Sequence, residues 1–193
     1  MKGVYIFLAE GFEDMEALAT NDVLVRGGVE VNPVSVTGEP FVVSSHGITV
    51  GTDMCLEDLD SDHGGTDASD VMIFPGGMPG TKNLAACAPL MRLMQDHYDA
   101  GGAVAAICAA PGLVLSRLGD RLKGAEFTCF EGFQDYTTEC GARFNPVPAV
   151  ISGRIITGRS AGWASEFGLK ILEFLTGEEN ARKVAYSLYL QEN

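Results

Sequence analysis

The chain has 193 residues and a formal net charge of -13, from 26 acidic and 13 basic side chains. This length suits one α/β domain with a sizeable core, and we expect a single domain over residues 1–193. The basic residues are not clustered as binding to a phosphate backbone requires, so no nucleic-acid partner is expected. The apolar run at residues 4–9 is too short for a signal peptide or a membrane span, so we expect a cytoplasmic protein with no membrane partner.

The cysteines and histidines predict free thiols and no metal site. The five cysteines form no C-x-x-C pair, and the three histidines show no ligand spacing with them. An odd cysteine count and the missing signal sequence favour free thiols in a reducing compartment, and a structural zinc site needs a spacing that is absent. The residues are Cys55, Cys87, Cys108, Cys129 and Cys140, with His46, His63 and His97.

The first half of the chain alternates between apolar β-branched runs and one segment of helical character. A helix begins at Asp14, with acidic residues in its first turn where they suit the helix dipole, and Gly27 and Gly28 end it. The segment 59–69, rich in Asp, Gly and Ser, is expected to be a solvated loop. Strands are expected at residues 4–8, 29–36, 41–45, 48–52 and 71–74, the third and fourth forming an antiparallel pair.

The second half continues the alternation. Helices are expected at residues 83–99, 109–118, 164–175 and 179–190, and strands at 103–107, 127–129, 149–151 and 154–157. Strands that alternate with helices imply a mostly parallel sheet with helices on both faces, and so a flavodoxin-like, three-layer α/β sandwich. In such sheets, ligands bind beyond the carboxyl ends of the strands.

Cys108 is the strongest candidate for a reactive residue. A strand of small residues runs directly into it, and a helix is expected immediately after it. This is the pattern of a nucleophile elbow, in which small neighbours tolerate a sharp turn. A thiol at a helix N-terminus also has its thiolate stabilised, which lowers its pKa. The alternative is a small buried hydrophobic residue, as free cysteines often are.

Two further segments follow predicted strands. Gly76 and Gly77 come directly after the strand at 71–74 and can turn backbone N–H groups toward a ligand or a developing oxyanion; a plain flexible turn fits the pattern equally well. An acidic segment at 13–16 opens the first helix. One of its acids can hydrogen-bond a thiol across the strand ends, but most acids in a first turn only complement the dipole. The sequence does not select which.

Together these segments resemble the ThiJ/PfpI superfamily, and within it the deglycase and glyoxalase branch known as DJ-one. The resemblance covers essentially the whole chain and implies a fold like that of the class I glutamine amidotransferases. Family members usually form homodimers with the pocket close to the interface. The residues that carry the resemblance are 8–16, Pro75-Gly76-Gly77 with Asn83-Leu84, 105–109, Thr157-Gly158-Arg159 and Glu166-Phe167.

The resemblance implies a role for each matching position. Cys108 matches the family's nucleophile, and Glu16 matches a buried glutamic acid that hydrogen-bonds the sulfur. Gly77 and Ala109 match the backbone donors of the oxyanion pocket, and Arg159 matches an arginine that lines this pocket. The implied substrate is a small electrophilic carbonyl such as methylglyoxal, or its early adducts with amines and thiols, and the implied reaction needs no cofactor.

Two departures from the family pattern bear on mechanism. Ala109 follows Cys108 where the protease-like branches place a histidine, and no histidine follows Cys108 at all, which disfavours a cysteine peptidase. Cys129 stands where the DJ-one branch commonly has a pocket histidine, so Glu16 would perform the acid–base work alone or with a group from a partner subunit. His46 stands where relatives have an interface arginine; the alternative is an ordinary surface histidine.

A non-enzymatic function also fits the same residues. An activated thiol that is hydrogen-bonded to a carboxylic acid is suited to controlled oxidation to a sulfinate. A redox-sensing or protective, chaperone-like protein is therefore the alternative to a glyoxalase or deglycase.

Overall fold

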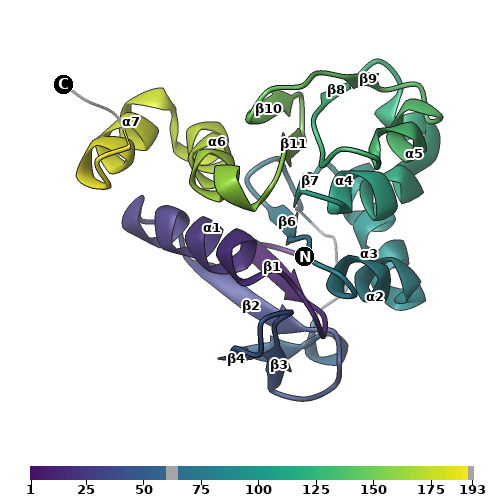
Figure 1. Ribbon diagram of the computed structural model, residues 1–193. Coiled ribbons are helices and arrows are strands. Elements are labelled where there is room, and N and C mark those ends of the chain that lie inside the picture. The colour runs from purple at the N-terminus through teal and green to yellow at the C-terminus, as the bar shows by residue number, and fades with distance from the viewer. Residues whose placement is uncertain (60–64, 191–193) are drawn as a thin grey trace.

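Seven strands form the central sheet of the molecule, which Figure 1 shows with helices on both sides. The computed structural model describes residues 1–59 and 65–190. All neighbouring strands pair in parallel except β10 and β11, which are antiparallel. In sheet order the strands are β10 (Ala149–Ser152), β11 (Ile155–Gly158), β7 (Ala103–Ile107), β6 (Val71–Phe74), β1 (Val4–Leu8), β2 (Val31–Ser35) and β5 (Met54–Cys55).

Helices cover both faces of this sheet, which confirms the predicted three-layer α/β architecture (Figure 1). On one face lie α1 (Asp14–Arg26) and α6 (Ala164–Thr176), with α7 (Glu178–Ser187) packed against α6. On the other lie α2 (Gly80–Ala86), α3 (Ala88–Asp99) and α4 (Ala110–Leu113), with α5 (Gln134–Thr138) beside α4.

Alternation along the central strands divides the core into two layers. In β1, Val4, Ile6 and Leu8 belong to the core beneath α1 and α6, whereas Phe7 belongs to the core on the opposite face. Every residue of β6 and β7 is buried. Strands that are covered on both faces read as continuous apolar runs, and this is why the sequence located them well.

The prediction of a single helix over residues 83–99 is wrong in one respect, because the chain forms two helices there. It leaves helical geometry at Cys87, whose ψ is 90°, and α3 then begins with Pro89 in its first turn. Proline has no N–H to donate to the preceding turn, so it is tolerated at a helix start but not inside a helix.

The helix expected over residues 109–118 is also shorter than predicted. The α-helical part is α4 alone, and a 3₁₀ segment follows over Leu115–Leu122. Gly112 approaches the backbone of Phe133 so closely that an added Cβ would lie 2.4 Å from the Phe133 carbonyl oxygen. Gly119 then adopts a φ of 58°, which breaks the 3₁₀ segment.

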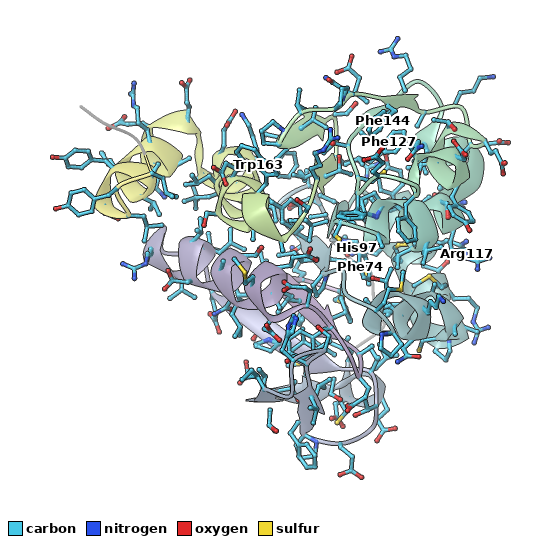
Figure 2. All side chains as sticks on the ribbon, viewed as in Figure 1. Phe74, His97, Arg117, Phe127, Phe144 and Trp163 are labelled. Carbon is cyan, nitrogen blue, oxygen red and sulfur yellow. The ribbon has the colours of Figure 1, made fainter. Side chains whose placement is uncertain are left out.

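Smaller pairs of strands lie outside the central sheet. The predicted antiparallel pair forms as β3 (Phe41–Val43) and β4 (Thr49–Gly51). The sequence missed α5, β5 and the parallel pairing of β8 (Glu126–Phe127) with β9 (Arg143–Phe144), all short elements. Figure 2 shows Phe127 and Phe144 near each other. Their ring centroids lie 5.7 Å apart. Within the predicted loop at 59–69, residues 60–64 lie outside the described part of the chain.

Candidate active site

The candidate residues gather at one edge of the sheet because their strands are neighbours. β11, β7, β6 and β1 are adjacent and parallel, so their carboxyl ends meet at the same edge. The segment after β1 carries Glu16, the one after β6 carries Gly76 and Gly77, the one after β7 carries Cys108, and the one after β11 carries Arg159.

Cys108 occupies a strained turn between β7 and α4. Its φ is 64°, a left-handed conformation that non-glycine residues rarely adopt and that costs about 1–3 kcal/mol. Two backbone hydrogen bonds hold it there. The Cys108 N–H donates to the carbonyl oxygen of Gly158 at 3.0 Å, and its own carbonyl accepts from the N–H of Phe130 at 2.8 Å. The elbow is therefore fixed by two segments far away in the sequence.

Glu16 is the acidic residue that reaches the thiol. Its side chain is 1% exposed, and its Oε2 accepts a hydrogen bond from the Gly76 N–H at 2.7 Å. Burial raises the pKa of Glu16 to about 7, against the opposing effect of hydrogen bonds with Cys108 and with the Gly76 N–H. The other carboxyl oxygen, Oε1, has no hydrogen-bond partner within the described residues. Glu16 is thus a desolvated acid that is hydrogen-bonded to the thiol.

Gly76 has a different role from the one considered in the sequence. Its N–H is taken up by Glu16, so it is not a free oxyanion donor. An added Cβ would lie 2.5 Å from Glu16 Oε2 and 2.7 Å from the Cβ of Cys108. The position therefore needs glycine because the carboxyl group and the cysteine both pack against it.

The pKa of Cys108 is raised rather than lowered, contrary to the prediction from its place before a helix. Burial is the largest cause, and the charge and hydrogen bond of Glu16 act in the same direction. The backbone N–H groups of Ala109 and Gly77 hydrogen-bond the sulfur and lower its pKa, but their effect is smaller than that of burial and Glu16. The helix that follows, α4, has only four residues, so its dipole is weak.

Cys129 and Arg159 lie next to the elbow on separate segments. Cys129 is fully buried, and burial raises the pKa of its thiol to about 12. The positive charge of Arg159 lowers this pKa, and the negative charge of Asp135 raises it. A neutral thiol therefore occupies the position for which the family pattern implies an imidazole.

His46 makes its hydrogen bonds to surface residues. It follows β3, its side chain is 64% exposed, and its Nδ1 lies 2.9 Å from Asp14 Oδ2 and 3.3 Å from Ser45 Oγ. In this chain it is a surface histidine paired with a carboxylate, and these contacts do not place it in the Cys108 pocket.

One group of side chains in the described residues has the spacing of metal ligands, which the sequence did not indicate. Ligand atoms of Glu13, Asp14 and His46 lie within 4.8 Å of one another. All three groups are already engaged, since Glu13 Oε2 accepts the N–H of Glu16 at 2.7 Å and Asp14 pairs with His46. His63 lies outside the described residues.

Glu13 is a positioning residue that the sequence did not single out. Its side chain caps α1 by accepting the Glu16 N–H at 2.7 Å, and its own N–H donates to the carbonyl oxygen of Gly76 at 3.1 Å. It therefore ties the segment after β1 to the segment after β6. An acidic residue just before a helix is a recognisable capping signal, but the second bond depends on the fold.

The fold and this site define a flavodoxin-like α/β protein with an elbow cysteine backed by a buried carboxyl group. A model of the DJ-1/PfpI family matches residues 2–174, and the chain belongs to this family. The resemblance drawn from the sequence is confirmed.

Individual relatives agree with the family assignment. The glutathione-independent glyoxalase DJR-1.2 of Caenorhabditis elegans is 35% identical over 181 residues, which cover 94% of this chain and 92% of the relative. The DJ-1 homolog B of Arabidopsis thaliana is 35% identical over the whole chain, which spans only 42% of that longer protein. The structure of oxidized DJ-1 from Toxoplasma gondii superposes with a TM-score of 0.86 at 30% identity, over 98% of each chain.

The helices of the described residues are also short on the scale of a bilayer. None of them has the length and apolar character that crossing a membrane would need.

Proposed function

We propose that this protein is a glutathione-independent glyoxalase or deglycase, which acts on methylglyoxal-type carbonyls or their early adducts. The observation that carries the proposal is the contact of the Cys108 thiol with Glu16, whose pKa of about 7 suits proton transfer near neutral pH. The C. elegans relative that is named as a glyoxalase supports the same reaction.

The first step forms a hemithioacetal. The Glu16 carboxylate takes the thiol proton as the Cys108 sulfur adds to the aldehyde carbon, and it passes this proton to the new alkoxide. The N–H groups of Gly77 and Ala109, which hydrogen-bond the sulfur in the free protein, are adjacent donors for the developing oxyanion. This stabilisation needs no metal ion and no cofactor.

The second step moves a proton between adjacent carbons. Glu16 removes the proton of the former aldehyde carbon, its electron pair forms an enediol, and the proton returns to the neighbouring carbon. The sulfur-bearing carbon becomes a thioester carbonyl. Water then hydrolyses the thioester, which releases a 2-hydroxy acid and restores the thiol. Methylglyoxal and one water thus give lactate without an external oxidant.

Glu16 is the only acid–base group that this mechanism uses. The pKa of the Cys129 thiol, at about 12, keeps that group protonated near neutral pH, so it does not act as a base. The two proton transfers also involve neighbouring atoms of the same substrate. One carboxyl group that contacts the sulfur can therefore carry out both proton transfers.

The test measures methylglyoxal consumption without glutathione for the wild type, Cys108→Ala and Glu16→Gln. We expect turnover in the wild type only. Glu16→Gln should keep its Cys108 alkylation by iodoacetamide, because glutamine retains a hydrogen-bond donor but cannot exchange a proton. Wild-type rates in Cys108→Ala would contradict the proposal, and full turnover in Glu16→Gln would leave the reaction without a base.

We also propose a homodimer formed through α1 and the β3–β4 hairpin. Met15 and Leu18 of α1 are 57% and 42% exposed, and Phe41 and Ile48 of the hairpin are 49% and 50% exposed. Hydrogen bonds from the Gly11 N–H to Val43 and from the Ser45 N–H to Phe12 hold the hairpin against the segment before α1. Exposed apolar side chains on neighbouring elements favour a protein interface.

The second candidate function is redox sensing. The observation in its favour is that Glu16 hydrogen-bonds the Cys108 sulfur and can donate to a sulfinate. The raised pKa of the thiol argues against it, because susceptibility to peroxide follows thiolate character. Stoichiometric oxidation of Cys108 by peroxide, without aldehyde turnover, would favour the sensor over the enzyme.

A further inference from the structure

Arg159 is unusual among the cations of this chain. All thirteen lysines and arginines lie in the described residues, and three of them are half-buried: Arg154, Arg159 and Lys170. Arg154 donates to two backbone carbonyls and lies over the ring of Tyr98, and Lys170 pairs with Glu173 at 2.7 Å. The guanidinium of Arg159 has no hydrogen bond or ion pair with any described residue.

The backbone of Arg159 adjoins the Cys108 elbow, and its charge acts on the neighbouring Cys129. Arg159 directly follows Gly158, whose carbonyl oxygen accepts the Cys108 N–H at 3.0 Å. Its charge lowers the pKa of Cys129, and the residue after Cys129 donates its N–H to the Cys108 carbonyl. Two backbone hydrogen bonds therefore join the Cys108 elbow to the segments that carry Arg159 and Cys129.

The acidic groups around this position do not neutralise Arg159. Asp135 of α5 raises the pKa of the Cys129 thiol, whereas Arg159 lowers it. Asp135 nevertheless forms no ion pair with Arg159. Glu16 carries no charge while it is protonated, and burial raises its pKa to about 7.

An unpaired, half-buried guanidinium is costly unless an anion joins it. No acceptor of the described chain offsets the free-energy cost of its partial desolvation with a hydrogen bond. The planar fork of arginine matches a carboxylate or a phosphate with two parallel hydrogen bonds. The chain as a whole carries a net charge of -13, so a local positive charge at the strand ends distinguishes this site from the rest of the molecule.

We propose that Arg159 binds the anionic group of the substrate, and that the substrate is a 2-oxoaldehyde bearing a carboxylate. This choice of substrate class rests on the proposed function. 4,5-Dioxopentanoate is the simplest probe. Cys108 adds to its aldehyde carbon, the hydrogen of that carbon moves to the adjacent carbonyl carbon, and water cleaves the thioester. One dioxopentanoate and one water give one 2-hydroxyglutarate, with no external oxidant or reductant.

The first experiment needs no turnover. Cys108 is alkylated with iodoacetate and, separately, with neutral iodoacetamide, and its peptide is quantified by mass spectrometry. The ratio of the two rates should fall about tenfold in Arg159→Gln and be largely retained in Arg159→Lys, because a nearby charge acts only on the anionic reagent. Arg92→Gln, which removes an exposed arginine of α3, should leave the ratio unchanged.

An unchanged ratio in Arg159→Gln would overturn the proposal, as would an equal fall in Arg92→Gln. If Arg159→Gln does not fold, the wild type itself provides the test. Its iodoacetate to iodoacetamide ratio should fall as NaCl screens the guanidinium. A ratio that is independent of salt would count against an anion site.

The second experiment compares kcat/KM for 4,5-dioxopentanoate and neutral 2-oxohexanal. The wild type should prefer the anion, and Arg159→Gln should lose this preference mainly through KM. Equal use of both aldehydes by the wild type would overturn the substrate class. If neither aldehyde is consumed but the alkylation ratio still falls in Arg159→Gln, the glyoxalase function fails and the anion site stands.

Discussion

The buried carboxyl group of Glu16 should make the protein less stable as pH rises. Burial raises its pKa to about 7 in the folded protein, from 4.5 as the ordinary value. Between these values the folded protein holds a proton that the unfolded chain has already released, so the free energy of unfolding falls as pH increases. Below this window both states are protonated, and above it both are ionised. The difference between the two pKa values corresponds to about 3 kcal/mol.

Glu16→Gln isolates this effect because glutamine has no charge at any of these pH values and still offers an oxygen to the Gly76 N–H. Urea unfolding followed by circular dichroism gives the free energy of unfolding from pH 4.5 to pH 8. The free energy of unfolding of Glu16→Gln, taken relative to that of the wild type, should rise by about 3 kcal/mol between pH 4.5 and pH 8. Subtracting the two curves cancels the contribution of the other acidic residues.

The matched control is Glu131→Gln, which removes an exposed carboxyl group from a loop. Because this side chain is exposed, its replacement should change the free energy of unfolding by no more than about 0.5 kcal/mol at any of these pH values. If the free energy of unfolding of Glu16→Gln also ran parallel to that of the wild type across this pH range, the predicted effect of Glu16 would be absent. This result would mean that Glu16 is not desolvated at the Cys108 site and is not the base of the proposed reaction.

Gly76→Ala should lose about 1–3 kcal/mol of stability in denaturant unfolding because its methyl group has no room, whereas Gly162→Ala, with nothing within 4 Å, should be nearly neutral. Light scattering should give a dimer for the wild type at micromolar concentration and a monomer for Leu18→Glu; a monomeric wild type would contradict the interface. The alkylation rate of Cys108 should still rise above pH 8, and a plateau below pH 7 would show that the thiol pKa is not raised.

The sequence predicted the sheet and the elbow because both depend on contiguous residues. β6 and β7 are buried on both faces, so their apolar runs mark them directly. Cys108 likewise stands at a change from strand to helix that is visible in its immediate neighbours. The separation of α2 from α3 was visible in principle at Pro89, but the helical pattern on both sides concealed it.

The electrostatics of the site depend on contacts that the sequence does not carry. Glu13, Asp14 and Glu16 all open the same helix, and only the family resemblance singled out Glu16. The fold then shows that Glu16 turns inward to the Gly76 N–H while Glu13 caps the helix. The predicted direction of the Cys108 pKa was wrong for a related reason. A helix start suggests a stabilised thiolate, but burial and an adjacent acid are tertiary features, and here they are stronger.

The raised pKa values of Cys108 and Glu16 describe one coupled pair rather than two independent groups. A negative charge on either residue makes ionisation of the other harder, so near neutral pH the pair carries at least one proton. That proton can lie on the sulfur or on the carboxyl group. Nucleophilic attack needs it on Glu16, and the N–H groups of Gly77 and Ala109 favour this arrangement because they hydrogen-bond the sulfur. The reactive thiolate is therefore produced by moving a proton within the pair, which requires neither a low thiol pKa nor a histidine.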